Sequence, residues 1–237
     1  MTAIDLSLLE RLTLSNGSHE DREDGVCAME AAAYIAGEPH SDHPTCVSPV
    51  ITSFMINWND SLPDDAERDR LLKPLIPLTL NTRTSPADED TRGWLAFDWL
   101  ARVCTPAWLR LAGLTEEAQL LEGTARIVDA ATCDAAMPAL GRARQRAAAA
   151  SAAARDAAWA AAWAAARAAA SAAAWAAAWA AASAAARDAA WAAARAAAWA
   201  AASDAASDAL RPTVAALQDS ASELVRQMCA VGRKAAA

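Results

Sequence analysis

The chain has 237 residues, a net charge of −8 and an apolar fraction of 55%, so it is long enough for one large or two small domains. The excess of acidic side chains excludes an indiscriminate attraction of the whole molecule to nucleic acid or anionic lipid. Residues 1–115 carry 18 acidic and 9 basic side chains, whereas residues 142–195 carry seven arginines and two aspartates. This asymmetry indicates that the two halves meet different surroundings, or each other.

The cysteines and the N-terminus bear on the cellular compartment. Five scattered cysteines without a CxxC pair argue against a disulfide framework and against a ribbon-type zinc site, and they fit a reducing environment. The opening stretch MTAIDLSLLERL has neither a basic nor a long apolar region, so no secretory signal is expected. We therefore expect a cytoplasmic protein.

The first part of the chain is predicted to form short helices separated by turn residues. An amphipathic piece at residues 4–14 precedes a polar loop, and a helix over residues 26–37 is expected to stop at Gly37. Ser48 and Pro49 are typical of an N-cap followed by the first helical residue. The helix that they begin is expected to end in a cap and turn at Trp58-Asn59-Asp60.

Short helices separated by turn residues are predicted to continue to residue 147. Residues 74–90 are expected to be irregular, and Thr105 with Pro106 repeats the cap-plus-proline signal for a new helix start. Further helices are predicted over residues 61–73, 89–103, 105–113, 115–128 and 131–147. Because no segment alternates polar and apolar residues with a period of two, no strand is predicted and the fold class is all-α.

Three regions follow from this pattern. Residues 1–140 form an acidic helical module, residues 141–211 an Ala/Trp-repeat helical region, and residues 212–237 a C-terminal amphipathic helix. Within the second region every fourth position from residue 151 to 207 is not alanine, and SAAARDAAWAAA occurs twice verbatim. Alanine is the best helix former, so the repeat is predicted to be helical.

The tryptophans of the repeat are the predicted interaction residues. Four residues advance about 400° around an α-helix, so each step of the repeat drifts by about 40° and the indoles form a spiral instead of one stripe. Exposed indoles on a lone rod favour aggregation, so we expect packing against a second copy or another helical protein. The anchors are Trp159, Trp163, Trp175, Trp179, Trp191 and Trp199.

The repeat has two alternative paths and two alternative roles. One continuous helix would measure roughly 100 Å at 1.5 Å per residue, and the alternative is a set of shorter antiparallel helices. A tolerated spacer, expanded by slippage in GC-rich DNA, is the structural alternative to an assembly segment. A membrane span is not expected, because the uncharged stretch between Arg167 and Arg187 consists mainly of alanine, which is barely apolar.

Nucleic acid is a further alternative partner. The arginines of the repeat and its indoles have the chemistry that binds unpaired bases and phosphates. The arginines lie on the same four-residue spiral and do not line one groove, so a solvated helix face explains them more simply. Binding of single-stranded nucleic acid is therefore an alternative to the expected protein partner.

Residues 19–60 hold the candidate chemistry of the chain. His40, His43 and Cys46 have a spacing similar to that of zinc ligands, and Cys27 or His19 would add a fourth ligand. A cysteine enzyme would use Cys27 as nucleophile near a helix N-terminus, where a thiolate is favoured. A histidine would act as base and Asp42 or Asp60 would orient it, with Glu30 as a further catalytic candidate. The alternative is that these cysteines are small buried apolar groups. No cofactor is expected, apart from this possible zinc ion.

One resemblance goes with these residues. The resemblance is carried by two segments, CAMEAAAYIAGEPHSDHPTCVSPVITSFMINWNDSLPDDAERDRLL and TPAWLRLAGL. Residues 19–115, which contain both segments, resemble a family of uncharacterised proteins from actinobacteria and their phages. The repeat is similar in composition to tracts of immunity-type helical proteins. The resemblance implies a coherent N-terminal module and an accessory role in phage–host conflict, and it assigns no functional residue.

Overall fold

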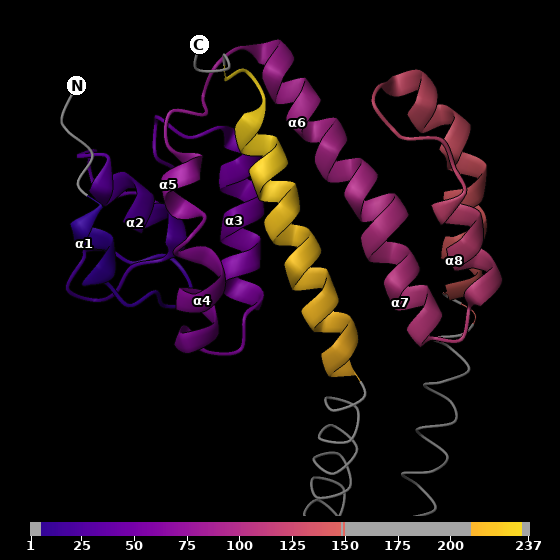
Figure 1. Cartoon of the computed structure of the whole chain (residues 1–237), viewed down its shortest axis with the longest axis horizontal. Helices are drawn as coiled ribbons and strands as arrows, with labels where there is room; N and C mark the ends of the chain where they lie inside the picture. The colour runs from indigo at the N-terminus through magenta and orange to yellow at the C-terminus, as the bar shows by residue number, and fades with distance from the viewer. Residues whose placement is uncertain (1–5, 148, 150–209, 234–237) are drawn as a thin grey trace, which may run out of the picture. The chain divides into compact units, whose positions relative to one another are not determined.

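The computed structural model describes residues 6–147, 149 and 210–233. Within these ranges the chain forms helices joined by turns and contains no strand, which confirms the all-α fold class. The Ala/Trp repeat and its six tryptophans lie outside the described residues. In chain order (Figure 1) the elements are α1 Ser7–Glu10, α2 Ala28–Ile35, α3 Pro49–Ser61, α4 Asp65–Leu72, α5 Ile76–Thr79, α6 Pro86–Trp99, the π-helix η1 Leu100–Cys104, α7 Thr105–Leu111 and α8 Thr115–Glu122. Residues 130–147 and 210–230 are also helical.

The chain divides into two units that do not follow the order of the sequence. Unit 1 combines Met1–Cys104, Thr124–Ala136 and Ala216–Ala237, and unit 2 combines Thr105–Gly123 with Met137–Ala215. The end of the chain thus shares a core with its beginning. No helix of the described residues is both long and apolar enough to cross a membrane.

The core of unit 1 is built around α2. Seven of its eight residues are buried, and it packs against α1, α3 and α5. Its alanines let the neighbouring backbones approach closely, while larger side chains from the surrounding helices fill the remaining volume. The helix of residues 210–230 contributes five buried residues to the same core: Ala221, Leu224, Val225, Met228 and Cys229.

Local capping signals set most helix bounds where the sequence predicts them. The Ser48 side chain accepts a hydrogen bond from the N–H of Ile51, with Pro49 in the first turn, as expected. Gly37 has a φ of 69° directly after α2, which confirms it as the stop. Two helices start inside the segment expected to be irregular: α5 at Ile76, and α6 at Pro86, where Ser85 and Asp88 form a capping box.

The predicted helix start at Thr105 is wrong. The helical backbone runs from α6 through η1 into α7, so Thr105 and Pro106 lie inside a helical stretch. Proline has no N–H for the helix ladder and its ring crowds the carbonyl four residues earlier. The π-turn at Leu100–Cys104 changes the hydrogen-bond spacing directly before the proline, as single-turn π-bulges do, so the helix continues instead of starting anew.

Arg92 holds the last turn of the chain's final helix within unit 1. Its side chain is fully buried, and it donates to the carbonyl oxygens of Met228 at 3.1 Å and Val231 at 2.8 Å. It also pairs with Glu89 at 2.8 Å. The last carbonyls of a helix lack partners within the helix and attract a cation, so the guanidinium fastens residues 216–233 to α6.

Unit 2 has a small core in its described part. α7 and α8 pack against each other, joined by a turn in which Gly113 has a φ of 76°. The buried apolar residues of this cluster are Leu109, Ala118, Leu121 and Ala143. The buried carboxylate of Glu117 accepts a hydrogen bond from Nε of Arg146 at 3.2 Å, which ties α8 to residues 137–147.

Candidate functional site

Glu30 is the centre of the polar cluster that residues 15–60 build in unit 1. It lies in the first turn of α2 with a side chain only 1% exposed. Its carboxylate accepts hydrogen bonds from the backbone N–H of Cys27 and of His19, both at 2.7 Å, and lies 2.8 Å from Nδ1 of His19. With the Cys27 sulfur accepting from the N–H of Glu30, the cluster forms a capping box. The buried carboxylate is thereby satisfied.

Ser15 extends this cluster into a chain of three side chains. Its Oγ lies 3.1 Å from Nε2 of His19, whose other ring nitrogen contacts Glu30. Serine, histidine and carboxylate are here in the order that nucleophilic hydrolases use, with the histidine as base and the carboxylate as its orienting group. We call these residues the Ser15–His19–Glu30 array.

The surroundings of Ser15 decide what the array can do chemically. Its hydroxyl oxygen accepts the N–H of Val26 at 3.1 Å and lies 3.3 Å from the carbonyl oxygen of Val26. A Cβ at Gly25 would stand 2.6 Å from Oγ of Ser15 and 2.7 Å from Nε2 of His19. Backbone therefore occupies the space where a substrate would approach the nucleophile and the base. The array fastens residues 15–26 onto α2, and it does not present a reactive hydroxyl.

Asn59 completes this fastening from α3. The predicted cap and turn at residues 58–60 is wrong, because α3 continues to Ser61 and Asn59 is fully buried within it. Its Nδ2 donates to the carbonyl oxygen of Ser15 at 2.9 Å, and its Oδ1 accepts from the N–H of Ala28 at 3.2 Å. One amide thus joins the loop, α2 and α3, which explains why a polar side chain occupies the core.

The predicted nucleophile Cys27 is a protonated thiol. Its pKa is raised to about 12, chiefly by burial; the hydrogen bond from the N–H of Glu30 opposes this rise, and the negative charge of Glu30 adds to it. The helix N-terminus was expected to favour a thiolate. Burial outweighs it here, so Cys27 acts as an apolar cap residue.

The predicted zinc ligands do not converge. His43 is exposed and pairs with its neighbour Asp42 at 2.7 Å, and no hydrogen bond or ion pair among the described residues joins Asp42 to Cys27 or Glu30. Burial and Glu38 raise the pKa of Cys46 to about 11. His40 lies beside the array, with Nε2 3.1 Å from the carbonyl oxygen of His19. Among the described residues, no three His, Cys, Asp or Glu side chains are placed to hold a metal ion.

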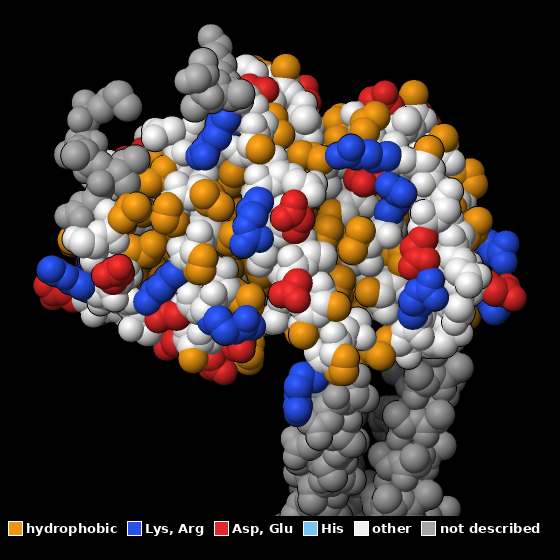
Figure 2. Space-filling model, in the orientation of Figure 1, with side chains coloured by type: hydrophobic (Ala, Val, Ile, Leu, Met, Phe, Trp, Pro, Cys, Tyr) orange, Lys and Arg blue, Asp and Glu red, His pale blue; other side chains and the backbone are white. Residues whose placement is uncertain are grey.

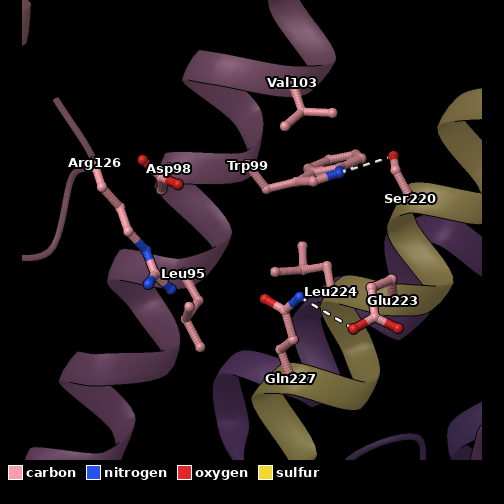
Figure 3. Close-up of a pocket in the computed structure, with 9 residues that line it drawn as sticks. All are labelled: Leu95, Asp98, Trp99, Val103, Arg126, Ser220, Glu223, Leu224 and Gln227. Atoms are coloured by element: carbon pink, nitrogen blue, oxygen red, sulfur yellow. Dashed lines mark hydrogen bonds between the residues drawn. The ribbon is translucent and has the colours of Figure 1, made fainter. Parts of the chain in front are cut away.

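A second feature of unit 1 is an apolar hollow of about 220 Å³ between α6 with η1 and the helix of residues 210–230. Hydrophobic side chains reach the surface where these two helices run beside each other (Figure 2). The lining side chains are Leu95, Asp98, Trp99, Val103, Arg126, Ser220, Glu223, Leu224 and Gln227 (Figure 3). Pockets for drug-sized ligands or cofactors measure about 300–1,000 Å³, so the hollow suits one large side chain.

Neither the array nor the hollow follows from the sequence motifs discussed above. Ser15 carries no local signal beyond its four-residue spacing from His19. The hollow joins residues 95–103 to residues 220–227, which are more than a hundred positions apart. Comparison with protein-family models, curated proteins and solved structures finds no match for this chain.

Proposed function

We propose that this chain is a non-enzymatic helical interaction protein that forms homo-oligomers, with the Ala/Trp repeat as its main assembly segment. The resemblance of residues 19–115 to proteins of actinobacteria and their phages suggests an accessory or immunity role in phage–host conflict. Self-association is the testable part of the proposal.

The observation that carries it is the exposed apolar surface of unit 2. Trp108, Leu111, Leu120 and Met137 are 42, 41, 39 and 51% exposed, and the described part of unit 2 buries the cluster Leu109, Ala118, Leu121 and Ala143. Trp108 and Leu111 are three residues apart in α7 and therefore lie on the same side of that helix. Large exposed apolar side chains of this kind are typical of a contact surface.

The state of the chemically reactive side chains agrees with this proposal. The Ser15–His19–Glu30 array is closed by Gly25, and burial raises the pKa of Cys27 to about 12. Both stabilise local structure through hydrogen bonds and packing. The exposed part of the molecule offers apolar and charged groups suited to binding another protein.

Sedimentation velocity over a range of concentrations tests the proposal. We expect the full chain to sediment as an oligomer and the double variant Trp108→Ala/Leu111→Ser to weaken association by about tenfold, since buried aromatic anchors dominate interface energies. Leu6→Ser is the matched control, because Leu6 is 50% exposed and belongs to unit 1. A chain that remains monomeric at all concentrations refutes the proposal.

A further inference from the structure

The hollow of unit 1 has a rigid apolar wall. The ring of Trp99 is fixed by a hydrogen bond from its Nε1 to Oγ of Ser220 at 3.0 Å and by an edge contact with Phe54, whose ring centre lies 5.7 Å away. Leu95 and Leu224 line the hollow with it (Figure 3). Because the Trp99 ring is already held in place, an apolar group that packs against it binds with little further loss of side-chain conformational freedom.

Two opposite charges flank this wall. Arg126 forms no ion pair with any described residue, and the one hydrogen bond that the Glu223 carboxylate accepts within the described part of the chain comes from Nε2 of Gln227, at 3.1 Å. Arg126 comes from the segment before residue 130 and Glu223 from the helix of residues 210–230, so the two charges stand on different walls (Figure 3). The third charge, Asp98, is already occupied by the N–H of Ile127 at 2.8 Å. An occupant therefore needs an apolar group between one cation and one anion.

The repeat contains this combination twice. The sequence Arg-Asp-Ala-Ala-Trp occurs at residues 155–159 and 187–191. On the helix that the alanines predict, side chains three and four positions apart lie on one face, so each motif presents an indole beside one guanidinium and one carboxylate. Of the six tryptophans of the repeat, only Trp159 and Trp191 have both charges at these spacings.

We infer that the hollow of one chain binds an Arg-Asp-Ala-Ala-Trp motif of a second copy, with the indole against Trp99 and Leu224. Arg155 or Arg187 then pairs with Glu223, and the aspartate that follows it pairs with Arg126. This inference rests on the proposed self-association and names its contact. The motif is assigned to another copy because the proposed function is self-association, and mixing two variants tests this assignment.

Charge reversal on either side of this contact tests it. Both Glu223→Arg and the double variant Arg155→Glu/Arg187→Glu place like charges together, and each is expected to weaken self-association at least about tenfold. Combining all three substitutions in one chain restores opposite charges and should restore association. Glu20→Arg is the matched control, because Glu20 is exposed and lies away from the hollow.

Mixing the two defective variants distinguishes contact between copies from contact within a chain. Each hollow then meets a motif of opposite charge on the other variant, so an equimolar mixture should associate while each variant alone does not. Unfolding temperatures equal to that of the unaltered chain exclude misfolding as the cause.

The outcomes separate this inference from the proposed function. If the unaltered chain is monomeric, self-association itself is refuted and the contact with it. If the chain associates but Glu223→Arg has no more effect than Glu20→Arg, only the contact is refuted. Weakening that neither the triple variant nor the mixture reverses also refutes the contact and leaves the proposed function intact.

Discussion

Arg92 offers a direct test of how the end of the chain is held against its beginning. The fully buried guanidinium donates to Met228 and Val231 in the last turn of the final helix and pairs with Glu89. Arg92→Ala would leave these three acceptors without their cation. Residues 216–230 should then separate from unit 1 more readily than they do in the unaltered protein.

The expected loss of free energy follows from the burial of the Arg92–Glu89 ion pair. Removing one partner of a buried ion pair costs roughly 3–5 kcal/mol. Glu89 is 23% exposed, so water can solvate its carboxylate after the substitution and reduce this cost. We expect Arg92→Ala to lower the free energy of local unfolding of residues 216–230 by about 3 kcal/mol. Arg92→Lys keeps the charge but lacks the planar fork that reaches several acceptors, so it should cost about 1–2 kcal/mol.

Hydrogen exchange of the amides in residues 216–230 measures this free energy locally. Arg83→Ala is the control, because Arg83 is exposed and its side chain has no partner among the described residues, and it should change the value by less than about 0.5 kcal/mol. If Arg92→Ala costs less than about 1 kcal/mol, the guanidinium does not hold this helix.

Three further predictions concern the polar loops. Gly25→Ala should destabilise unit 1 by at least about 2 kcal/mol in urea unfolding, because its φ of 138° and the close contact with Ser15 both oppose a Cβ. Gly17→Ala is the control, because Gly17 has a φ of 81° but open space around it, so this substitution should cost less. Equal costs would contradict the steric conflict between a Cβ at residue 25 and Ser15. Burial raises and hydrogen bonds from Cys46 and Thr45 lower the pKa of Glu38, with a net value below its ordinary 4.5. The ionised form is therefore favoured by folding, so its stabilisation is present above pH 4.5 and is lost as pH falls through the lowered pKa; Glu38→Gln should reduce this acid-induced loss of unfolding free energy, and an unchanged pH profile would argue against it. Cys27, whose pKa burial raises to about 12, should resist iodoacetamide at pH 8 in native protein and react after unfolding, whereas the partly exposed Cys133 should react in both states; rapid native labelling of Cys27 would overturn its assignment as a buried cap.

Local sequence signals are sufficient to specify the all-α fold class and several helix bounds. Ser48 with Pro49 begins α3, and Gly37 and Gly113 end the helices before them. These signals act through backbone groups within a few residues, so local chemistry is sufficient to specify them. The same local rules failed at Thr105 and Pro106, because a π-turn from the preceding residues carries the helix through the proline.

Which side chains meet depends on how the helices pack. Burial turns Cys27 from an expected nucleophile into a protonated cap, and Gly25 closes the array that Ser15 and His19 form with Glu30. Arg92 reaches carbonyls 136 and 139 positions away, and the hollow needs walls from residues 95–103 and 220–227, which are more than a hundred positions apart. Periodicity and spacing report which residues share a helix face, whereas burial and convergence depend on contacts between segments far apart in sequence.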